Sequence, residues 1–418
     1  MLHKLCKECG EWRAESLCLT HREIRFLRTM THLGYFLSIG LLLTAVVECQ
    51  RRPFRPKPPR TRPPKARKPP KAPKPSKAAF SEPVEPIHLT TLPPPLPPGP
   101  RSVFSDCPRE CVCPPDHPSA LYCDSRNLRV VPLIPPRIEY LYLQNNFIES
   151  LPVLSFRNAT QLKWINLDNN RISSRKVDKD LFTILNKVLF LYMAQNRLDE
   201  VPANLPPSLE QLRLSRNQIS KIPPGTFNQL ANLTLLDLHH NNLLDNVLNK
   251  NTFKGLKSLM QLNLAHNSLR KMPPTVPPHI FQLFLDKNSI SQIPNNYFKK
   301  LHQLTFLRLN FNQLTDKGIP NGIFNVSTLL GLQLSNNKLN SIPIINPKLE
   351  HLYLSYNHIE RINGSEVCPR SLTSIALNSH DLEAVPRLRY IRLDGNALAP
   401  PIPIDFMLCF RLLQAIVI

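Results

Sequence analysis

The chain has 418 residues, 42% of them hydrophobic, so it is long enough to bury an extended core. It contains 44 prolines but only 11 glycines, a balance that is unusual for a globular enzyme. No Gly-rich phosphate loop and no G-x-S-x-G element occurs, and the His239-His240 pair has no obvious third metal ligand. We therefore expect a protein that is not an enzyme, with no catalytic residues, no cofactor and no metal.

Residues 30–49 have the form of a secretory signal, with an apolar run from Leu33 to Val47. The run is short for a membrane-spanning helix, and no second apolar stretch reaches that length, so we predict secretion without membrane insertion. Residues 1–29 precede this signal and are interpreted as a doubtful upstream extension, with initiation at Met30. Their C-x2-C-x8-C-x2-H pattern has ligand types that suit zinc, but its place before the signal argues against a metal site.

Residues 50–77 form a basic arm in which lysine and arginine alternate with proline, and no acidic residue is present. Such a segment cannot pack a core, and its prolines keep it extended. One interpretation of this segment is a solvated linker. The more specific interpretation is an arm that binds a polyanion. A secretory signal and the scarcity of aromatic residues argue against nucleic acid as the partner. The predicted polyanion-binding residues are Arg51, Arg52, Arg55, Lys57, Arg60, Arg62, Lys65, Arg67, Lys68, Lys71, Lys74 and Lys77.

Residues 78–106 are a Pro-rich linker, and residues 107–123 are predicted to form a cysteine cap. The cap has the spacing C-x3-C-x-C-x9-C, which leaves three disulfide pairings open. A cap is expected here because the first coil of a stack of repeats would otherwise expose its core. The cap cysteines are Cys107, Cys111, Cys113 and Cys123.

Residues 124–398 contain a repeat with the pattern L-x-x-L-x-L-x-x-N-x-L, seen clearly in residues 259–269. Leu262 and Leu264 are two apart and should both point inward in a strand, whereas Gln261 and Asn263 should face outward. The amide of Asn267 should bond main-chain groups of adjacent coils. The pattern recurs with its asparagine at positions 146, 170, 196, 217, 241, 267, 288, 312, 337 and 357, and once more at 396.

The repeat predicts an α/β-type leucine-rich repeat solenoid, a curved horseshoe with parallel strands on its concave face. The steps between successive asparagines run 24, 26, 21, 24, 26, 21, 24, 25 and 20 residues. Prolines fill the outer segments of the short coils, so the convex side should be mostly extended or 3-10. Cys368 and Cys409 flank an irregular coil, and a disulfide there would close the second cap, at residues 399–418.

Outward strand positions supply an exposed row of aromatic and charged residues that would suit an extended protein ligand. The candidate contact residues are Tyr142, Trp164, Tyr192, Arg213, Asp237, Phe284, Arg308 and Tyr353. A competing interpretation is that some rings only cover neighbouring strands. Four N-glycosylation sequons, at Asn158, Asn232, Asn325 and Asn363, fall outside these positions, so glycans would leave the wall open.

The cysteine cap, the alternating coil lengths and the Cys368–Cys409 pair resemble the small leucine-rich repeat proteoglycans of the fibromodulin-like class. That resemblance implies disulfides Cys107–Cys113 and Cys111–Cys123 and a long "ear" repeat before the C-terminal cap. It also implies a secreted linker of the extracellular matrix. The arm would bind heparin or heparan sulfate, as on the proteoglycan perlecan, and the repeats would bind fibrillar collagens, anchoring basement membrane to connective tissue. A homodimer is compatible with the sequence.

A second hypothesis is a secreted modulator that sequesters a growth factor or a complement component on its concave face. A receptor ectodomain is disfavoured because no apolar segment of spanning length follows Cys409. No Ser-Gly dipeptide occurs, so the usual chondroitin sulfate attachment signal is missing and the arm would bind glycosaminoglycan rather than carry it there.

Overall fold

The computed structural model describes residues 104–362, 386–398 and 401–418. Residues 93–418 form one compact unit, and residues 1–92 are grouped separately. The signal, the basic arm and nearly all of the linker therefore lie outside the described residues, as do Asn363, Cys368 and the part of the irregular coil up to residue 385.

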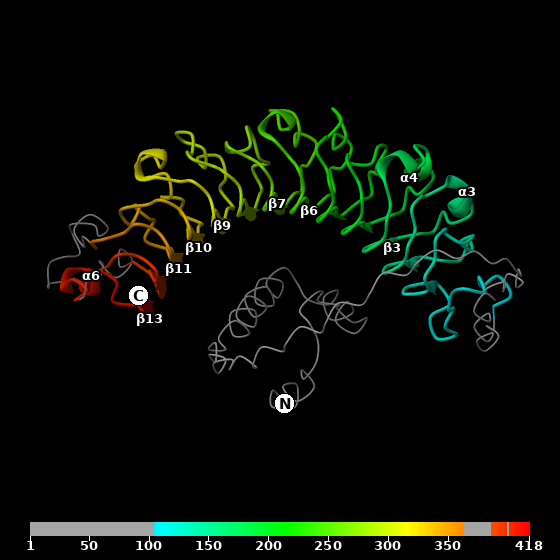
Figure 1. Cartoon of the computed structure of the whole chain (residues 1–418), viewed down its shortest axis with the longest axis horizontal. Coiled ribbons are helices and arrows are strands. Elements are labelled where there is room, and N and C mark those ends of the chain that lie inside the picture. Colours follow the sequence, from blue (N-terminus) through cyan, green and yellow to red (C-terminus); the bar gives the residue numbers. More distant parts are fainter. Residues whose placement is uncertain (1–103, 363–385, 399–400) are drawn as a thin grey trace, which may run out of the picture. The chain divides into compact units, whose positions relative to one another are not determined.

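One parallel sheet of thirteen strands runs through the described part of the chain, and neighbouring strands follow one another in sequence. Figure 1 shows the strands along the inner, concave side of a curved stack of coils. This confirms the predicted solenoid. The strands are β1 (Ala120–Tyr122), β2 (Tyr140–Tyr142), β3 (Trp164–Asn166), β4 (Phe190–Tyr192), β5 (Gln211–Arg213), β6 (Leu235–Asp237), β7 (Gln261–Asn263), β8 (Gln282–Phe284), β9 (Phe306–Arg308), β10 (Gly331–Gln333), β11 (His351–Tyr353), β12 (Tyr390–Arg392) and β13 (Ala415–Val417).

The register of the sheet is set by the buried aliphatic residue at the centre of each strand. Leu212 pairs with Leu236, which pairs in turn with Leu262, and all three are fully buried. The leucine two positions later, such as Leu264, is also fully buried. Because side chains alternate across a strand, the residues on either side of the central one face the concave side. The expected orientation of the repeat is confirmed.

Within the described residues the convex side contains only short helical turns, in agreement with its predicted extended or 3-10 character. Helices α3 and α4 lie on the outer side of the stack in Figure 1. Proline at the outer turns interrupts longer helices because it lacks an N–H and clashes with the preceding turn. The segments are α3 (Val153–Phe156), η1 (Ser174–Lys176), α4 (Leu181–Ile184), η2 (Asp245–Val247), η3 (Asp316–Gly318) and α6 (Ile404–Cys409).

The asparagine of each repeat connects neighbouring coils through its side-chain amide. The Nδ2 of Asn241 donates to the carbonyl of Leu238 in its own coil at 3.1 Å and to Leu214 in the preceding coil at 3.0 Å. Its Oδ1 accepts the N–H of Ile219 at 2.9 Å. Asn267 repeats the pattern with Leu264, Leu238 and the N–H of Leu243, as the sequence predicts. The amides therefore satisfy main-chain groups that the turns leave unpaired.

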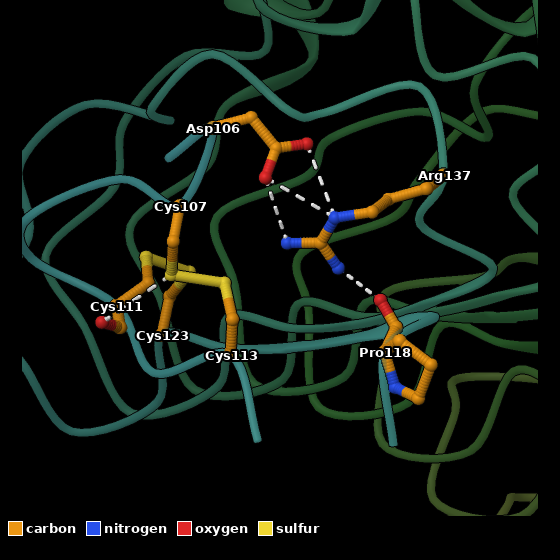
Figure 2. Close-up of a disulfide and its surroundings, with 7 residues drawn as sticks. All are labelled: Asp106, Cys107, Cys111, Cys113, Pro118, Cys123 and Arg137. Carbon is orange, nitrogen blue, oxygen red and sulfur yellow. Dashed lines mark hydrogen bonds and ion pairs between the residues drawn. A yellow bond between two sulfur atoms is a disulfide. The ribbon is translucent and has the colours of Figure 1, made fainter. Parts of the chain in front are cut away.

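Two disulfides close the N-terminal end of the stack, Cys107–Cys113 and Cys111–Cys123, which are the pairs that the family resemblance implies. Figure 2 shows them next to a bidentate contact between Arg137 and Asp106, at 3.0 Å, which ties the cap to the first coils. At the other end Cys409 is disulfide-bonded, and Cys368, its predicted partner, lies outside the described residues.

We predict that replacing Asn241 by alanine lowers the free energy of unfolding by about 2–3 kcal/mol, because the buried N–H of Ile219 loses its acceptor. Asn242, its exposed neighbour, makes only a 3.5 Å contact, so Asn242→Ala should cost less than about 0.5 kcal/mol. Denaturant unfolding followed by circular dichroism measures both. Equal losses for the two variants would contradict the structural role of the amide.

Candidate functional site: the concave wall

The concave wall is formed by the outward residues of the strands. All eight residues predicted as ligand contacts occupy such positions, in strands β2, β3, β4, β5, β6, β8, β9 and β11. Seven of them are partly exposed. Tyr192 is the exception because only 7% of it is exposed, so it supports its neighbours and offers little surface to a ligand.

Aromatic rings gather at the end of the wall that lies nearest the cysteine cap. The rings of Tyr122 and Tyr142 are stacked, with centroids 4.7 Å apart. The Trp164 indole lies 4.9 Å from the rings of both Phe190 and Tyr192. Packed rings of this kind present a rigid apolar surface at a small entropic cost, which is the usual character of a binding hot spot.

The centre of the wall is a charged cluster. The guanidinium of Arg213 lies over the Tyr192 ring at 4.5 Å. On the same face the Asp237 Oδ1 lies 2.8 Å from the His239 Nδ1. Arg213 and Asp237 are direct partners in the register of β5 and β6. The wall therefore offers adjacent positive and negative groups.

Asp168 extends this cluster toward the cap, two residues after β3. Its Oδ1 accepts the N–H of Ala194 at 2.6 Å. Burial raises the pKa of its carboxyl to about 6, and the negative charge of Asp237 adds to the rise, whereas the hydrogen bond and the charge of Arg213 oppose it. Asp168 is thus an acid that a positively charged ligand group would help to ionise.

A second ion pair lies further along the wall, where Arg308 Nε is 2.7 Å from Asp286 Oδ2. Asp286 is 5% exposed, and its other oxygen accepts the N–H of Asn310 at 2.9 Å. Burial raises the pKa of Asp286, although Arg308 opposes the rise. The Arg308 guanidinium also lies 5.0 Å from the centre of the Phe284 ring, so two of the predicted contact residues touch each other.

A third charged group ends the wall near the C-terminus. Arg392 and Asp394 form a bidentate contact at 3.0 Å, and the Ser355 hydroxyl donates to Asp394 at 2.7 Å. Burial opposes ionisation of Asp394, but these hydrogen bonds and the charge of Arg392 hold its pKa below the usual value. The Tyr353 and Tyr390 rings lie beside this group, 5.6 Å apart.

Three acids of the wall, Asp168, Asp286 and Asp394, were not predicted from the sequence, because the prediction treats only the two positions that flank each central aliphatic residue as outward. All three occur two residues after a strand, so a register that included this third position would have found them. The described residues contain no group of three His, Cys, Asp or Glu that could hold a metal ion. The aromatic rings and ion pairs of the concave wall are groups that can bind a ligand.

The sequons at Asn158, Asn232 and Asn325 lie on exposed residues that precede strands, outside the concave wall. Within the described part of the chain, no helix is both long and apolar enough to cross a membrane.

Comparisons with known proteins agree with the repeat architecture. A family model described as "Leucine rich repeat" matches residues 136–198 and 207–269, and a second leucine-rich repeat model matches residues 348–374. Among solved structures, a chain in the complex of Latrophilin 3, Unc5D and FLRT2 is 27% identical with a TM-score of 0.53, covering 69% of this chain and 84% of that one. A leucine-rich repeat protein of Leptospira interrogans is 22% identical with a TM-score of 0.52 and shares the fold. The match covers 68% of this chain and 73% of that chain.

The chain is therefore a leucine-rich repeat protein, and its curated relatives specify the family. Prolargin of Mus musculus is 60% identical over 385 residues, which are 92% of this chain and 99% of that protein. Prolargin of Homo sapiens is 61% identical, covering 81% of this chain and 88% of that protein. Keratocan of Bos taurus is 55% identical, and the match covers 75% of this chain and 89% of that protein. The chain belongs with these proteins to the small leucine-rich repeat proteoglycans, a family of the extracellular matrix.

We predict that Asp168→Asn stabilises the protein at neutral pH by about 1–3 kcal/mol and has little effect near pH 3. The folded-state pKa of Asp168, about 6, lies above the ordinary 3.8, so its contribution to stability is full below about pH 4 and is lost as the pH rises through 6. An asparagine can keep the bond to Ala194 without a charge. In the equivalent place Asn310 accepts the N–H of Ser335 at 2.9 Å.

Denaturant unfolding between about pH 3 and pH 8 measures this effect. Asp180→Asn is the matched control, because Asp180 is exposed and makes no side-chain capping bond to α4. Identical pH profiles for Asp168→Asn and the unsubstituted protein would exclude the expected cost of ionising Asp168.

Proposed function

We propose that this protein is a secreted linker of the extracellular matrix. In this proposal the basic arm of residues 50–77 binds heparin or heparan sulfate on a perlecan-like proteoglycan. The repeats bind fibrillar collagen through the concave wall, so that the two modules anchor basement membrane to connective tissue. The proposal rests on one observation. A cation-rich, proline-spaced segment and a wall of rings and paired charges occupy different stretches of the sequence.

The composition of the arm supports a sulfated partner. Twelve cations in 28 residues, with no carboxylate, give a dense positive charge that binds a polyanion by releasing its counterions. Proline restricts the arm before binding, so less chain entropy is lost when a linear polyanion engages many cations together. At about 3.1 Å per residue the arm would span roughly 85 Å.

The wall supports a rod-like protein partner. With strands about 4.8 Å apart, thirteen strands would give an inner surface roughly 58 Å long. A collagen triple helix exposes the X and Y side chains of its Gly-X-Y repeats along its whole length. The alternation of Arg213 with Asp237, and the presence of Arg308 and Arg392 farther along, would complement a mixed-charge rod. The aromatic rings near the cap would supply an apolar anchor.

For the arm, we predict that substituting its twelve lysines and arginines with glutamine moves elution from immobilised heparin to much lower salt at neutral pH. The reason is that each lost cation removes one released counterion. Binding to collagen fibrils should persist. In the control, the six arginines of the arm are replaced by lysine, which keeps the charge and should leave most of the affinity. If the glutamine variant elutes with the unsubstituted protein, the arm is only a spacer.

For the wall, we predict that Arg213→Glu weakens binding to collagen fibrils by about 10–100-fold, because an arginine stacked on an aromatic ring is a typical hot spot. Arg175→Glu, on the exposed convex turn η1, makes the same charge change and should leave binding intact. Sedimentation with fibrils measures both. Unchanged collagen binding combined with lost binding of a soluble growth factor or complement component would favour the sequestering modulator.

A further inference from the structure

The edge of the sheet at which the strands end carries a line of basic residues. We call the asparagine that bonds adjacent coils in each repeat the ladder asparagine. In each described repeat the residue directly before it takes a left-handed backbone, with φ between 50° and 60° at Arg216, His240, His266 and Lys287. These four residues belong to the consecutive coils of β5 to β8. The coils of β3 and β4 place Arg171 and Arg197 directly after their asparagines.

We call these six residues the edge row. Each of six successive coils contributes one member: Arg171, Arg197, Arg216, His240, His266 and Lys287. Five members are exposed and His266 is half-buried. Across the coils of β2 to β12, no Asp or Glu occupies either of the two positions that flank the ladder asparagines. The edge row is therefore uninterrupted by acidic side chains at these positions.

Ring contacts orient four members of the edge row. The imidazoles of His240 and His266 are stacked, with centroids 5.2 Å apart and planes 14° from parallel. At one end the Lys287 ammonium lies 5.2 Å from the centre of the Phe311 ring, and at the other the Arg171 guanidinium lies 4.5 Å from that of Phe147. These contacts orient the cations before any ligand arrives, which lowers the entropic cost of binding.

The groups around the histidine pair are mostly positive. Burial lowers the pKa of His266, and the charges of Lys287, His240, His239 and Arg216 lower it further. Two acids on the neighbouring strands and turns are already paired, Asp237 with His239 at 2.8 Å and Asp286, directly before Lys287, with Arg308 at 2.7 Å. At the far end Glu149 lies near Arg171 and Arg197 but is paired with Lys176 at 2.6 Å. An anion laid along the edge row would therefore relieve repulsion at the histidines.

The predicted glycans would lie away from the edge row. Asn232 comes three residues before β6, on the edge at which strands begin, and Asn158 and Asn325 come six residues before β3 and β10. Members of the edge row instead follow their strands. Because the strands are parallel, these two sets of residues belong to opposite edges of the sheet.

We propose that the edge row is a second binding site for a sulfated polysaccharide, separate from the basic arm, and that it binds more tightly as the pH falls. A linear array with one basic residue per coil, about 4.8 Å apart, matches a long chain of repeating negative groups. A folded acidic protein would need an apolar centre to its interface, and the edge row provides only the isolated rings of Phe147 and Phe311.

The pH dependence follows from linkage. His240 and His266 stand between the permanent cations Arg216 and Lys287, and histidine is the side chain that ordinarily changes its charge between about pH 5 and pH 8. A bound polyanion favours the protonated form of any histidine that it contacts, so binding and protonation reinforce each other. The extra affinity is therefore complete below the pKa of the free protein and is lost as the pH rises through the pKa of the complex.

The test uses the full chain with the twelve arm cations replaced by glutamine, so that the arm contributes little. We expect this protein to bind immobilised heparin about tenfold more tightly at about pH 5.5 than at pH 7.5. His240→Asn with His266→Asn should remove the pH dependence. Asparagine tolerates the left-handed backbone and stands in the same place at Asn145, Asn169 and Asn336, so the fold should persist.

A charge-matched pair of variants tests the position of the site. Arg216→Asn with Lys287→Asn should lower the salt needed for elution at about pH 5.5, whereas Lys254→Asn with Lys257→Asn should change it little. Equal losses in both pairs, or a pH dependence that survives the histidine substitutions, would overturn the proposal. Competition by polyglutamate as effective as that by heparin of equal charge would also overturn it, in favour of an acidic peptide. These outcomes leave the proposed role of the arm untouched, since that role is measured at neutral pH by comparing the intact arm with its glutamine variant.

Discussion

The structure depends on the side-chain amide that links each coil to the one before it. A stack of coils with three-residue strands leaves many main-chain groups at its turns without partners, and a buried group without a partner costs about 1–3 kcal/mol. The side chain of Asn241 bonds four main-chain groups, and Asn267, Asn288 and the other ladder asparagines bond equivalent groups along the stack. Leucine burial drives the coils together, and the amides fix where each coil begins to turn.

That constraint also fixes where functional side chains point. Because Leu212, Leu236 and Leu262 align in register, the residues beside them form continuous rows on the concave face. Likewise, because each amide needs the same turn, the residue before it adopts a left-handed backbone and projects from the same edge in every coil. A repetitive core therefore generates two repetitive surfaces, the wall and the edge, whose chemistry is free to vary from coil to coil.

The two surfaces differ in how their charges are arranged. On the wall most charged residues have a partner, as Arg308 has Asp286 and Arg392 has Asp394, which suits a ligand that carries both signs. On the edge row basic residues follow one another from coil to coil, and from β2 to β12 no acid occupies either position that flanks a ladder asparagine, which suits a ligand of one sign. Together with the basic arm, these arrangements are consistent with a matrix protein that contacts partners of different kinds through separate regions.

The sequence by itself determined the solenoid, the inward leucines, the bonding role of Asn267 and the placement of the eight wall residues, because a repeated local pattern has few ways to fold. It left three pairings open for the cap cysteines, and the family resemblance selected the pairing that the structure contains, Cys107–Cys113 with Cys111–Cys123. Only the tertiary structure decided that Trp164 and Arg213 cover Tyr192, that burial raises the pKa of Asp168, and that the rings of His240 and His266 stack. These features arise between coils, from residues some 20 or more positions apart, and the exposure and electrostatics of a side chain there depend on which neighbours the curved stack brings against it.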